Sequence, residues 1–200
     1  MLHLPRAKKH DNGVDSRTAI LNAAVVSFGE LGYYGTSLQK IANTVGMTKA
    51  GVLHHVGSKE GLLDIVLNEV YDDATDSIVV GYIDAKRPLI AEMWRAVVAI
   101  NSKRPEQVHM FSTLDAESID PKHPAHNYFK NRDQHVVDVT LKTKWVVPEG
   151  IDIKDFVQAG FSMMDGIQLR WLRSPERDLN EMWAECEAEL MPMPMWEGYR

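Results

Sequence analysis

The stretch Gly35–Leu63 reads GTSLQKIANTVGMTKAGVLHHVGSKEGLL, and it decides the fold of the N-terminal part of the chain. It holds two short helical patterns of about two turns each, with a capping residue before each pattern and a glycine after it. The capping residues are Thr36 or Ser37 and then Thr48, and the glycines are Gly46 and Gly57. Two short helices joined by a tight turn predict a helix-turn-helix, whose second helix enters the major groove of DNA.

The flanking residues fit this motif. An apolar stripe at helical spacing precedes it and predicts a bracing helix that ends at Gly32; its members are Ile20, Leu21, Ala24, Phe28 and Leu31. In the second short helix, Val52 and Val56 stand one turn apart and are expected to point inward. Small and polar residues are left on its outer side, where base edges and phosphates are read.

The two histidines of this stretch, His54 and His55, raise the question of a metal site. Adjacent residues of a helix project about 100° apart, so the pair cannot chelate one metal ion together. We therefore interpret both as groove-facing residues. The positive ends of the helices near Ser37 and Ser58, together with Lys59, favour phosphate oxygens. The residues predicted to bind DNA are Thr36, Ser37, Gln39, Thr48, Lys49, Ala50, Gly51, Leu53, His54, His55 and Lys59.

The distribution of charge agrees with one DNA-facing end. The chain has 200 residues and a net charge of −6. Residues 1–60 hold seven Lys and Arg against four Asp and Glu, whereas the remainder holds 15 against 24. A basic front on an acidic body is expected where only the front meets a polyanion. Basic residues at the extreme N-terminus, Arg6, Lys8 and Lys9, can either enter a neighbouring minor groove or remain a solvated tail.

The remaining composition limits the class of protein. With 44% hydrophobic residues the chain can bury a real core. No run reaches the roughly 18 apolar residues of a membrane span, and the N-terminus lacks the features of a signal peptide. We therefore expect a cytoplasmic protein with no membrane partner. Because Cys186 is the only cysteine, an intramolecular disulfide is excluded.

The segment Ser16–Leu63 resembles the DNA-binding domain of the TetR (tetracycline-repressor) family of bacterial transcriptional regulators. The positions that meet the family pattern are Thr36, Ile41, Ala42, Gly46, Val52, His55, Ser58, Lys59 and Glu60, with Met47 and Thr48 as conservative variants. Two positions depart from it. Leu53 stands where the family commonly has a tyrosine whose hydroxyl meets a phosphate, and Val56 stands where it has a core phenylalanine.

The resemblance implies an all-α fold of about nine helices. A three-helix DNA-binding domain, with the N-terminal arm at residues 1–60, would precede a larger ligand-binding and dimerisation domain at residues 61–200. Prolines divide the second part into predicted helices at Ile90–Ser102, Pro105–Glu117, Ala125–Lys144, Ile153–Arg173 and Leu179–Leu190. The last two resemble the helices through which members form a homodimer, with Ile167, Leu169 and Leu172 as apolar contacts. A two-fold dimer would read a pseudo-palindromic operator in double-stranded DNA.

The resemblance also implies an effector pocket in the second domain. A small molecule that fits only one state of the dimer would shift it toward or away from operator binding, typically relieving repression. The predicted ligand-binding residues are Trp94, Met110, Phe111, Leu114, Tyr128, His135, Phe161, Met164, Gln168 and Trp171. Aromatic and methionine residues at helical spacing more often form an ordinary core.

An enzyme is the alternative function. Glu106 and His109 have the Glu-x-x-His spacing of helical di-iron proteins, but a second such pair is missing. His123 and His126, with Asp120 nearby, have the spacing of metal ligands, and we interpret their segment as an exposed loop because no fourth ligand accompanies them. The sequence therefore predicts a transcriptional regulator without catalytic residues, cofactor or metal.

Overall fold

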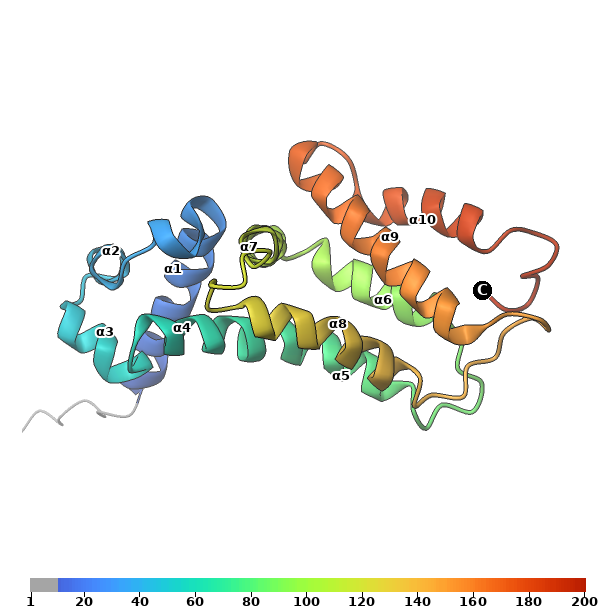
Figure 1. Ribbon diagram of the computed structural model, residues 1–200, viewed down its shortest axis with the longest axis horizontal. Helices are drawn as coiled ribbons and strands as arrows, with labels where there is room; N and C mark the ends of the chain where they lie inside the picture. The colour runs from blue at the N-terminus through green and yellow to red at the C-terminus, as the bar shows by residue number, and fades with distance from the viewer. Residues whose placement is uncertain (1–10) are drawn as a thin grey trace, which may run out of the picture.

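The computed structural model describes residues 11–200, with the side chains of all of these except 11–15, 73, 74 and 76. Within this part of the chain every regular element is a helix, as predicted. The elements are α1 (Asp11–Gly35), α2 (Leu38–Thr44), α3 (Lys49–Val56), α4 (Lys59–Ile65), η1 (Val66–Asp72), α5 (Asp73–Gly81), α6 (Ile90–Asn101), α7 (Pro105–Glu117), α8 (His126–Thr140), α9 (Ile153–Arg173) and α10 (Leu179–Leu190). Because α4, η1 and α5 follow one another without a break, the described residues form nine separate rods (Figure 1).

The first helix is bent near its end. Gly32 has φ 66° and ψ −176°, a combination that is essentially restricted to glycine, so the helix predicted to end there breaks and resumes for a short final turn. The apolar stripe before the break is buried at Ile20, Ala24 and Phe28. Leu31, the last member of the predicted stripe, is 37% exposed.

The next three helices begin at side-chain caps. The hydroxyl of Ser37 accepts a hydrogen bond from the Lys40 amide, Thr48 accepts from the amide of Gly51, and Ser58 accepts from that of Gly61. Between α2 and α3, Gly46 has φ 67°, which lets the chain turn within a few residues. The predicted helix-turn-helix is therefore present, with α1 behind it.

The long rod contains a feature that the sequence does not predict. It starts as α4, passes through the π-helical segment η1, and continues as α5. Its inward residues are those of the predicted apolar face: Leu62, Leu63 and Val66 are buried and Val70 is half-buried. Wide π turns are rare and are frequently found at functional sites. Figure 1 shows this rod running from the N-terminal helices toward the opposite end of the molecule.

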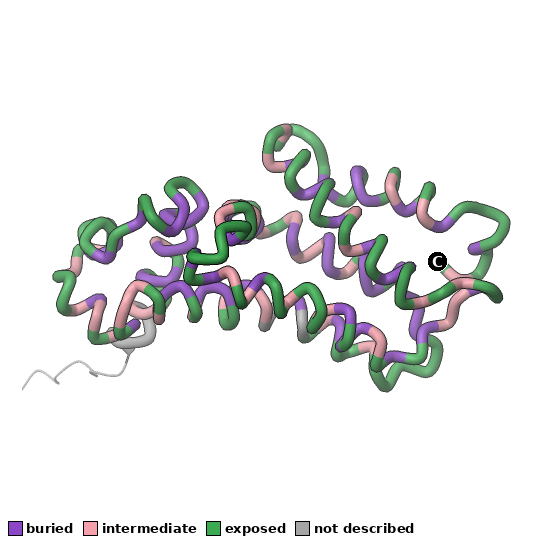
Figure 2. The backbone as a smooth tube through the Cα atoms, viewed as in Figure 1, coloured by how far each residue is buried: buried purple, intermediate pink, exposed green. Residues whose placement is uncertain are grey.

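Two apolar cores stabilise the molecule (Figure 2). The first unites α1–α4 and η1 with residues of the second half of the chain, namely Met110, Phe111, Leu114, Ala125 and Phe129. The second lies among α5, α6, α8, α9, α10 and the C-terminal segment. The predicted boundary at residues 60 and 61 therefore falls inside the first core rather than between the cores.

The C-terminal half follows the predicted helices closely. The bounds of α7, α9 and α10 agree with the prediction, but α8 spans His126–Thr140 rather than Ala125–Lys144. It stops early because the indole of Trp145 donates a hydrogen bond to the carbonyl of Thr140, at 2.8 Å, in place of another helical turn. Among the described residues, no helix has the length and apolar character that crossing a membrane requires.

Candidate nucleic-acid interface and ligand cavity

The third helix presents its polar end to solvent. Val52 is completely buried and Val56 is 5% exposed, so both point inward as predicted. Ala50 and His54 are exposed on the side opposite them, and Lys49 and the capping residue Thr48 are exposed at the start of the helix. This surface of α3 has no bulky apolar side chain at its N-terminal end, and its first backbone amides are available to an acceptor.

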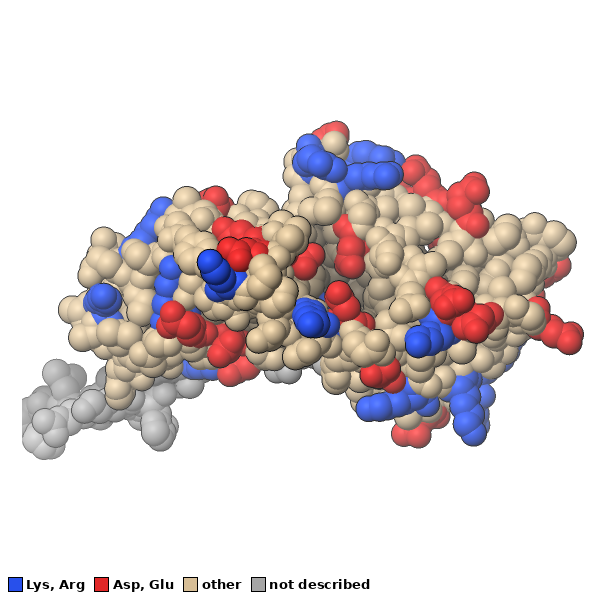
Figure 3. Space-filling view, viewed as in Figure 1, with Lys and Arg blue, Asp and Glu red and all other residues tan. Residues whose placement is uncertain are grey.

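The exposed face of α2 extends this surface. Ser37 and Gln39 are exposed, and the Gln39 amide donates a hydrogen bond to Asn43 at 2.8 Å. Lys40 is exposed beside them, a residue that the sequence analysis did not single out although its place next to Gln39 could have indicated it. Within the described part of the chain, neither Lys40 nor Lys49 forms an ion pair. Figure 3 shows blue side chains at this end of the molecule on a mostly uncharged surface.

Thr36 does not belong to this surface. Its side chain is 2% exposed, and its hydroxyl lies 2.8 Å from the carbonyl of Gly32 and 2.9 Å from that of Ser27. The predicted DNA contact is therefore replaced by a structural role: Thr36 joins the break in α1 to the start of α2. Its match to the family pattern is explained by this buried contact.

The remaining predicted DNA-binding residues are less exposed. Gly51, Leu53 and His55 are half-buried, and Leu53 packs partly against the first core. The imidazole rings of His54 and His55 meet edge to face with their centroids 5.8 Å apart. Of the two histidines, His54 is thus the one that is exposed on α3.

The side chain of Lys59 makes contacts within the protein. Its ammonium lies 4.1 Å from the centre of the Tyr33 ring, and burial lowers the pKa of the Lys59 side chain despite the nearby charges of Glu60 and Glu117. The hydroxyl of Tyr33 donates a hydrogen bond to Glu60 at 2.7 Å, which holds the pKa of that carboxyl below its usual range. Lys59 therefore fastens α4 to α1 as well as standing near the predicted phosphate position.

A cavity of about 280 Å³ lies between η1, α5, α6, α8 and α9. Of the predicted ligand-binding residues, Phe161, Met164 and Gln168 line it. The structure places the others elsewhere. Trp94, Met110, Phe111, Leu114 and Trp171 are buried in the two cores, Tyr128 is half-buried against the first core, and His135 is exposed on α8.

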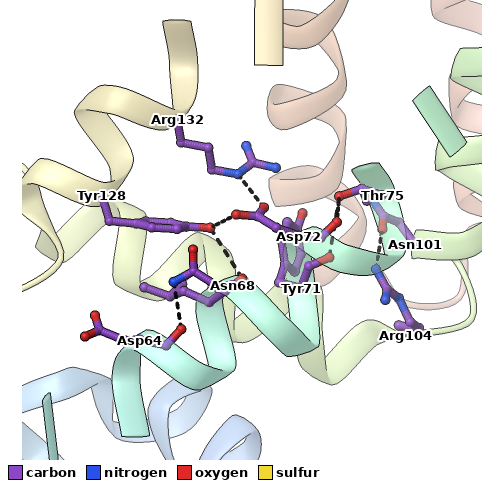
Figure 4. A network of polar contacts seen from close by, with 10 residues as sticks. Asp64, Asn68, Tyr71, Asp72, Thr75, Asn101, Arg104, Tyr128 and Arg132 are labelled. Atoms are coloured by element: carbon purple, nitrogen blue, oxygen red, sulfur yellow. Dashed lines mark hydrogen bonds and ion pairs between the residues drawn. The ribbon is translucent and has the colours of Figure 1, made fainter. Parts of the chain in front are cut away.

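The cavity walls include polar residues that the sequence did not predict, such as Asn101 and Arg132. Asn101 and the predicted Gln168 are both buried, and the Asn101 amide donates a hydrogen bond to Gln168 at 3.0 Å. Arg132 lies on the opposite side, and its Nε donates a hydrogen bond to Asp72 at 2.8 Å. The hydroxyl of Tyr128 also donates to Asp72, so three residues from η1 and α8 point toward one another (Figure 4).

The segment after α7 is exposed at Asp120 and on both sides of His123, as predicted, but His123 itself is buried. His123 is 3% exposed, with its ring edge to face against Tyr33 and Tyr34. Its Nδ1 accepts a hydrogen bond from the Ala125 amide, and its Nε2 lies 3.3 Å from Glu117. The ring is buried because the turns around it fold back onto the end of α1.

Metal-ligand chemistry is not assembled in the described residues. No group of three or more His, Cys, Asp and Glu side chains lies close enough together there to hold a metal ion. Glu106 and His109 are both exposed on α7, and the His109 ring lies near Gly29 of α1. The basic residues Arg6, Lys8 and Lys9 lie outside the described residues.

The predicted dimer contacts on α9 differ from one another in exposure. Leu169 is 47% exposed and Leu172 is half-buried. Ile167, in contrast, is 3% exposed and belongs to the second core, so its side chain is not available to a partner. Gly166, beside it, has open space around the position of a Cβ atom.

Comparisons with known proteins agree with this architecture. Residues 20–66 match the family described as bacterial regulatory proteins, tetR family. The chain is 39% identical to the HTH-type transcriptional regulator RutR of Escherichia coli K12 over 56 residues, 28% of this chain and 26% of RutR. It is 26% identical to the HTH-type transcriptional repressor KstR2 of Rhodococcus jostii over 121 residues, 60% of this chain and 52% of KstR2. The matches thus span about a quarter and about half of these relatives.

Solved structures share the fold over nearly the whole chain. GusR of Salmonella enterica superposes with a TM-score of 0.67 at 14% identity, covering 92% of this chain and 98% of GusR. The fatty acid degradation regulator FadR of Bacillus halodurans gives a TM-score of 0.65 at 17% identity, covering 94% of this chain and all of FadR. Residues 20–66 therefore match the TetR family of bacterial regulatory proteins, and the chain as a whole has the same all-helical fold as these solved structures.

Proposed function

We propose that this protein is a DNA-binding transcriptional regulator that acts as a homodimer, and that its operator binding is relieved by a small molecule. The observation that carries the proposal is the exposed polar end of α3, held outward by the buried anchors Val52 and Val56. The curated relatives RutR and KstR2 are a transcriptional regulator and a transcriptional repressor, respectively. Both support the same class of function for this chain.

In this proposal, α3 enters the major groove and α2 lies across the backbone. Lys49 and His54 face base edges, whereas Lys40 and the N-terminal end of α2 contact phosphates. Ser37, Gln39, Thr48, Ala50 and Gly51 complete the interface. Leu53, His55 and Lys59 contribute from its half-buried edge. Since phosphate contacts carry no base information, the two lysines are expected to act differently.

The test is a binding titration with labelled DNA taken from upstream of the protein's own gene, at several salt concentrations. Lys40→Ala should weaken binding to all sequences alike and reduce the slope of log affinity against log salt by about 1 for each phosphate contact removed. Lys49→Ala should change which operator positions tolerate substitution. Lys154→Ala, which removes an exposed lysine from the first turn of α9, is the matched control and should behave as the parent protein.

Two results would contradict the proposal. One is a parent protein that binds upstream DNA no better than unrelated DNA of the same length. The other is a Lys40→Ala variant whose salt slope and affinity equal those of Lys154→Ala, since this would remove α2 from the interface.

The dimer is proposed to form through α9 and α10, the helices Ile153–Arg173 and Leu179–Leu190. Leu169 is a large apolar side chain left exposed on α9, and Ala184 and Ala188 are exposed on α10. Such residues permit close helix packing across a two-fold axis. Sedimentation should show that Leu169→Glu dissociates the dimer, whereas Ile119→Glu, a change at an apolar residue that is 81% exposed after α7, should leave it intact.

The cavity between η1 and α9 is proposed as the effector site. One of its walls belongs to the rod that begins as α4 beside the DNA-binding helices, so a ligand there contacts the same rod that positions α3. A ligand shifts the equilibrium only by its differential affinity for the two states. We assign no catalytic role to the chain, because its curated relatives are regulators.

A further inference from the structure

The lining of the cavity combines apolar side chains with three charged ones. Tyr71, Val97 and Phe161 supply apolar surface from η1, α6 and α9, and further valines come from α5 and α8. Its volume of about 280 Å³ lies at the lower limit of the roughly 300–1,000 Å³ that small-molecule pockets usually have. The space therefore suits a compact ligand with a substantial apolar part.

Three charged residues line the cavity: Arg132, Asp133 and Asp165. Arg132 is already neutralised, because its Nε lies 2.8 Å from Oδ1 of Asp72, outside the lining (Figure 4). The Tyr128 hydroxyl lies 2.5 Å from the other oxygen of Asp72 and strengthens that ion pair. The positive charge of Arg132 is thus compensated by Asp72 within the protein.

The two carboxylates of the lining have no such partner. Within the described part of the chain, no ion pair or hydrogen bond holds the side chain of Asp133 or Asp165. Asp165 is exposed on α9, yet the protein packed around it desolvates its carboxyl and raises the pKa of Asp165 to about 6. Arg132 opposes the shift, and Asp115 and Asp133 add to it.

We propose that this cavity binds small amphipathic cations, molecules that combine an apolar body with one basic nitrogen. The inference rests on the proposed role of the protein as a ligand-responsive regulator and names the chemical class of its effector. A basic nitrogen beside Asp165 and Asp133 neutralises two unpaired carboxylates, while the body of the molecule covers Phe161 and Val97. An anionic ligand would meet the same carboxylates and would have to compete with Asp72 for Arg132.

Three probes of equal shape test the proposal: 4-phenylbutylamine, 4-phenylbutanol and 4-phenylbutyrate, which differ in the charge of one end. Calorimetric titration of the full chain at pH 7.5 should give an affinity for the amine at least about tenfold above that for the alcohol. The carboxylate should bind most weakly. Binding of the carboxylate as tight as that of the amine, or no binding of any probe, would overturn the proposal.

Variants locate the site. Asp165→Asn should bring the affinity for the amine close to that for the alcohol while leaving the alcohol unchanged, and Asp133→Asn should act in the same direction. Asp155→Asn removes the same charge from α9 away from the cavity lining and should keep the full preference for the amine. A preference that survives in both cavity variants would mean that the cation binds elsewhere, and the proposal would fail.

The DNA titration without any probe separates this proposal from the proposed function. Upstream DNA bound by a protein that shows no preference for the amine would overturn the ligand class and leave the regulator intact. A preference for the amine without specific DNA binding would overturn the proposed regulator and leave the ligand class intact.

Discussion

The hydroxyl of Tyr128 lies 2.5 Å from Oδ2 of Asp72, and this contact joins α8 to the last residue of η1. The two residues are 56 positions apart in the sequence. Asp72 receives Arg132 on its other oxygen, so one carboxylate ties two turns of α8 to the rod that continues from α4. The rod is therefore joined to α8 at Asp72, beside the cavity.

Removal of the Tyr128 hydroxyl should weaken this joint. Tyr128→Phe keeps the aromatic contacts but deletes a hydrogen bond to a charged acceptor, and we expect the free energy of unfolding to fall by about 1–2 kcal/mol. The midpoint of urea unfolding measures the loss. Tyr34→Phe, at a tyrosine that is 65% exposed, is the control and should leave the midpoint unchanged. Equal midpoints for Tyr128→Phe and the parent would show that the contact contributes nothing to stability.

A side chain at Gly32 should disrupt the contact between α1 and α7. A Cβ atom there would lie 1.8 Å from Oε1 of Glu117, whose other oxygen accepts a hydrogen bond from the Tyr33 amide at 2.7 Å. The backbone at Gly32 adds strain of its own, so Gly32→Ala should cost roughly 2 kcal/mol or more. Thermal unfolding measures the loss. Gly81→Ala, where nothing lies within 4 Å of the added atom, should be close to neutral. Comparable melting temperatures for the two variants would contradict this account.

A substitution that restores the family tyrosine at position 53 should strengthen DNA binding. The TetR family commonly has a tyrosine there whose hydroxyl meets a phosphate, and Leu53 is half-buried on α3. Leu53→Tyr should tighten operator binding by about fivefold for each half-site, as one added hydrogen bond of about 1 kcal/mol implies. Leu53→Phe adds the ring without the hydroxyl and should gain nothing. A gain of equal size in both variants would assign the effect to packing.

The ionisation of Asp165 should appear in the pH dependence of stability. Although Asp165 is exposed on α9, desolvation by the protein around it raises the pKa of this carboxyl from its ordinary 3.8 to about 6. Arg132 opposes this shift, Asp115 and Asp133 add to it, and Tyr71 also faces the carboxyl but stays uncharged in this range. The folded state thus holds the proton more tightly, so Asp165 costs no stability below pH 4 and its full cost above pH 6. Relative to Asp165→Asn, the parent protein should become less stable as the pH rises from about 4 to 6. Urea unfolding of both proteins across this range isolates Asp165, because their other groups are the same. A difference independent of pH would refute the prediction.

Local patterns were sufficient to predict most helices. Proline and capping residues mark the starts of α7, α9 and α10, and alternating faces identify Val52 and Val56 as inward anchors. These features act over one or two turns, so they are readable in the sequence. The burial of Thr36 is not, because its partners Ser27 and Gly32 meet it only after α1 breaks.

The cavity could not be predicted in the same way. Aromatic and methionine residues fill cores as readily as they line pockets, and Trp94 and Met110 prove to be completely buried. The charged lining residues Arg132 and Asp165 come from different helices and have no periodic signature. Their chemistry depends on which partner each meets in space, and the π turns of η1, which bring Asp72 to Arg132, leave no mark in the residue pattern.

The first core has a consequence for engineering. Met110, Phe111 and Leu114 of α7, with Phe129 of α8, cover the apolar side of the N-terminal helices. A fragment cut after residue 60 would leave that side open to water and lose the burial that stabilises it. The DNA-binding helices are thus not an independent module. A chimaera that joins them to the ligand-binding part of another regulator has to include α7 or replace the apolar surface that α7 supplies.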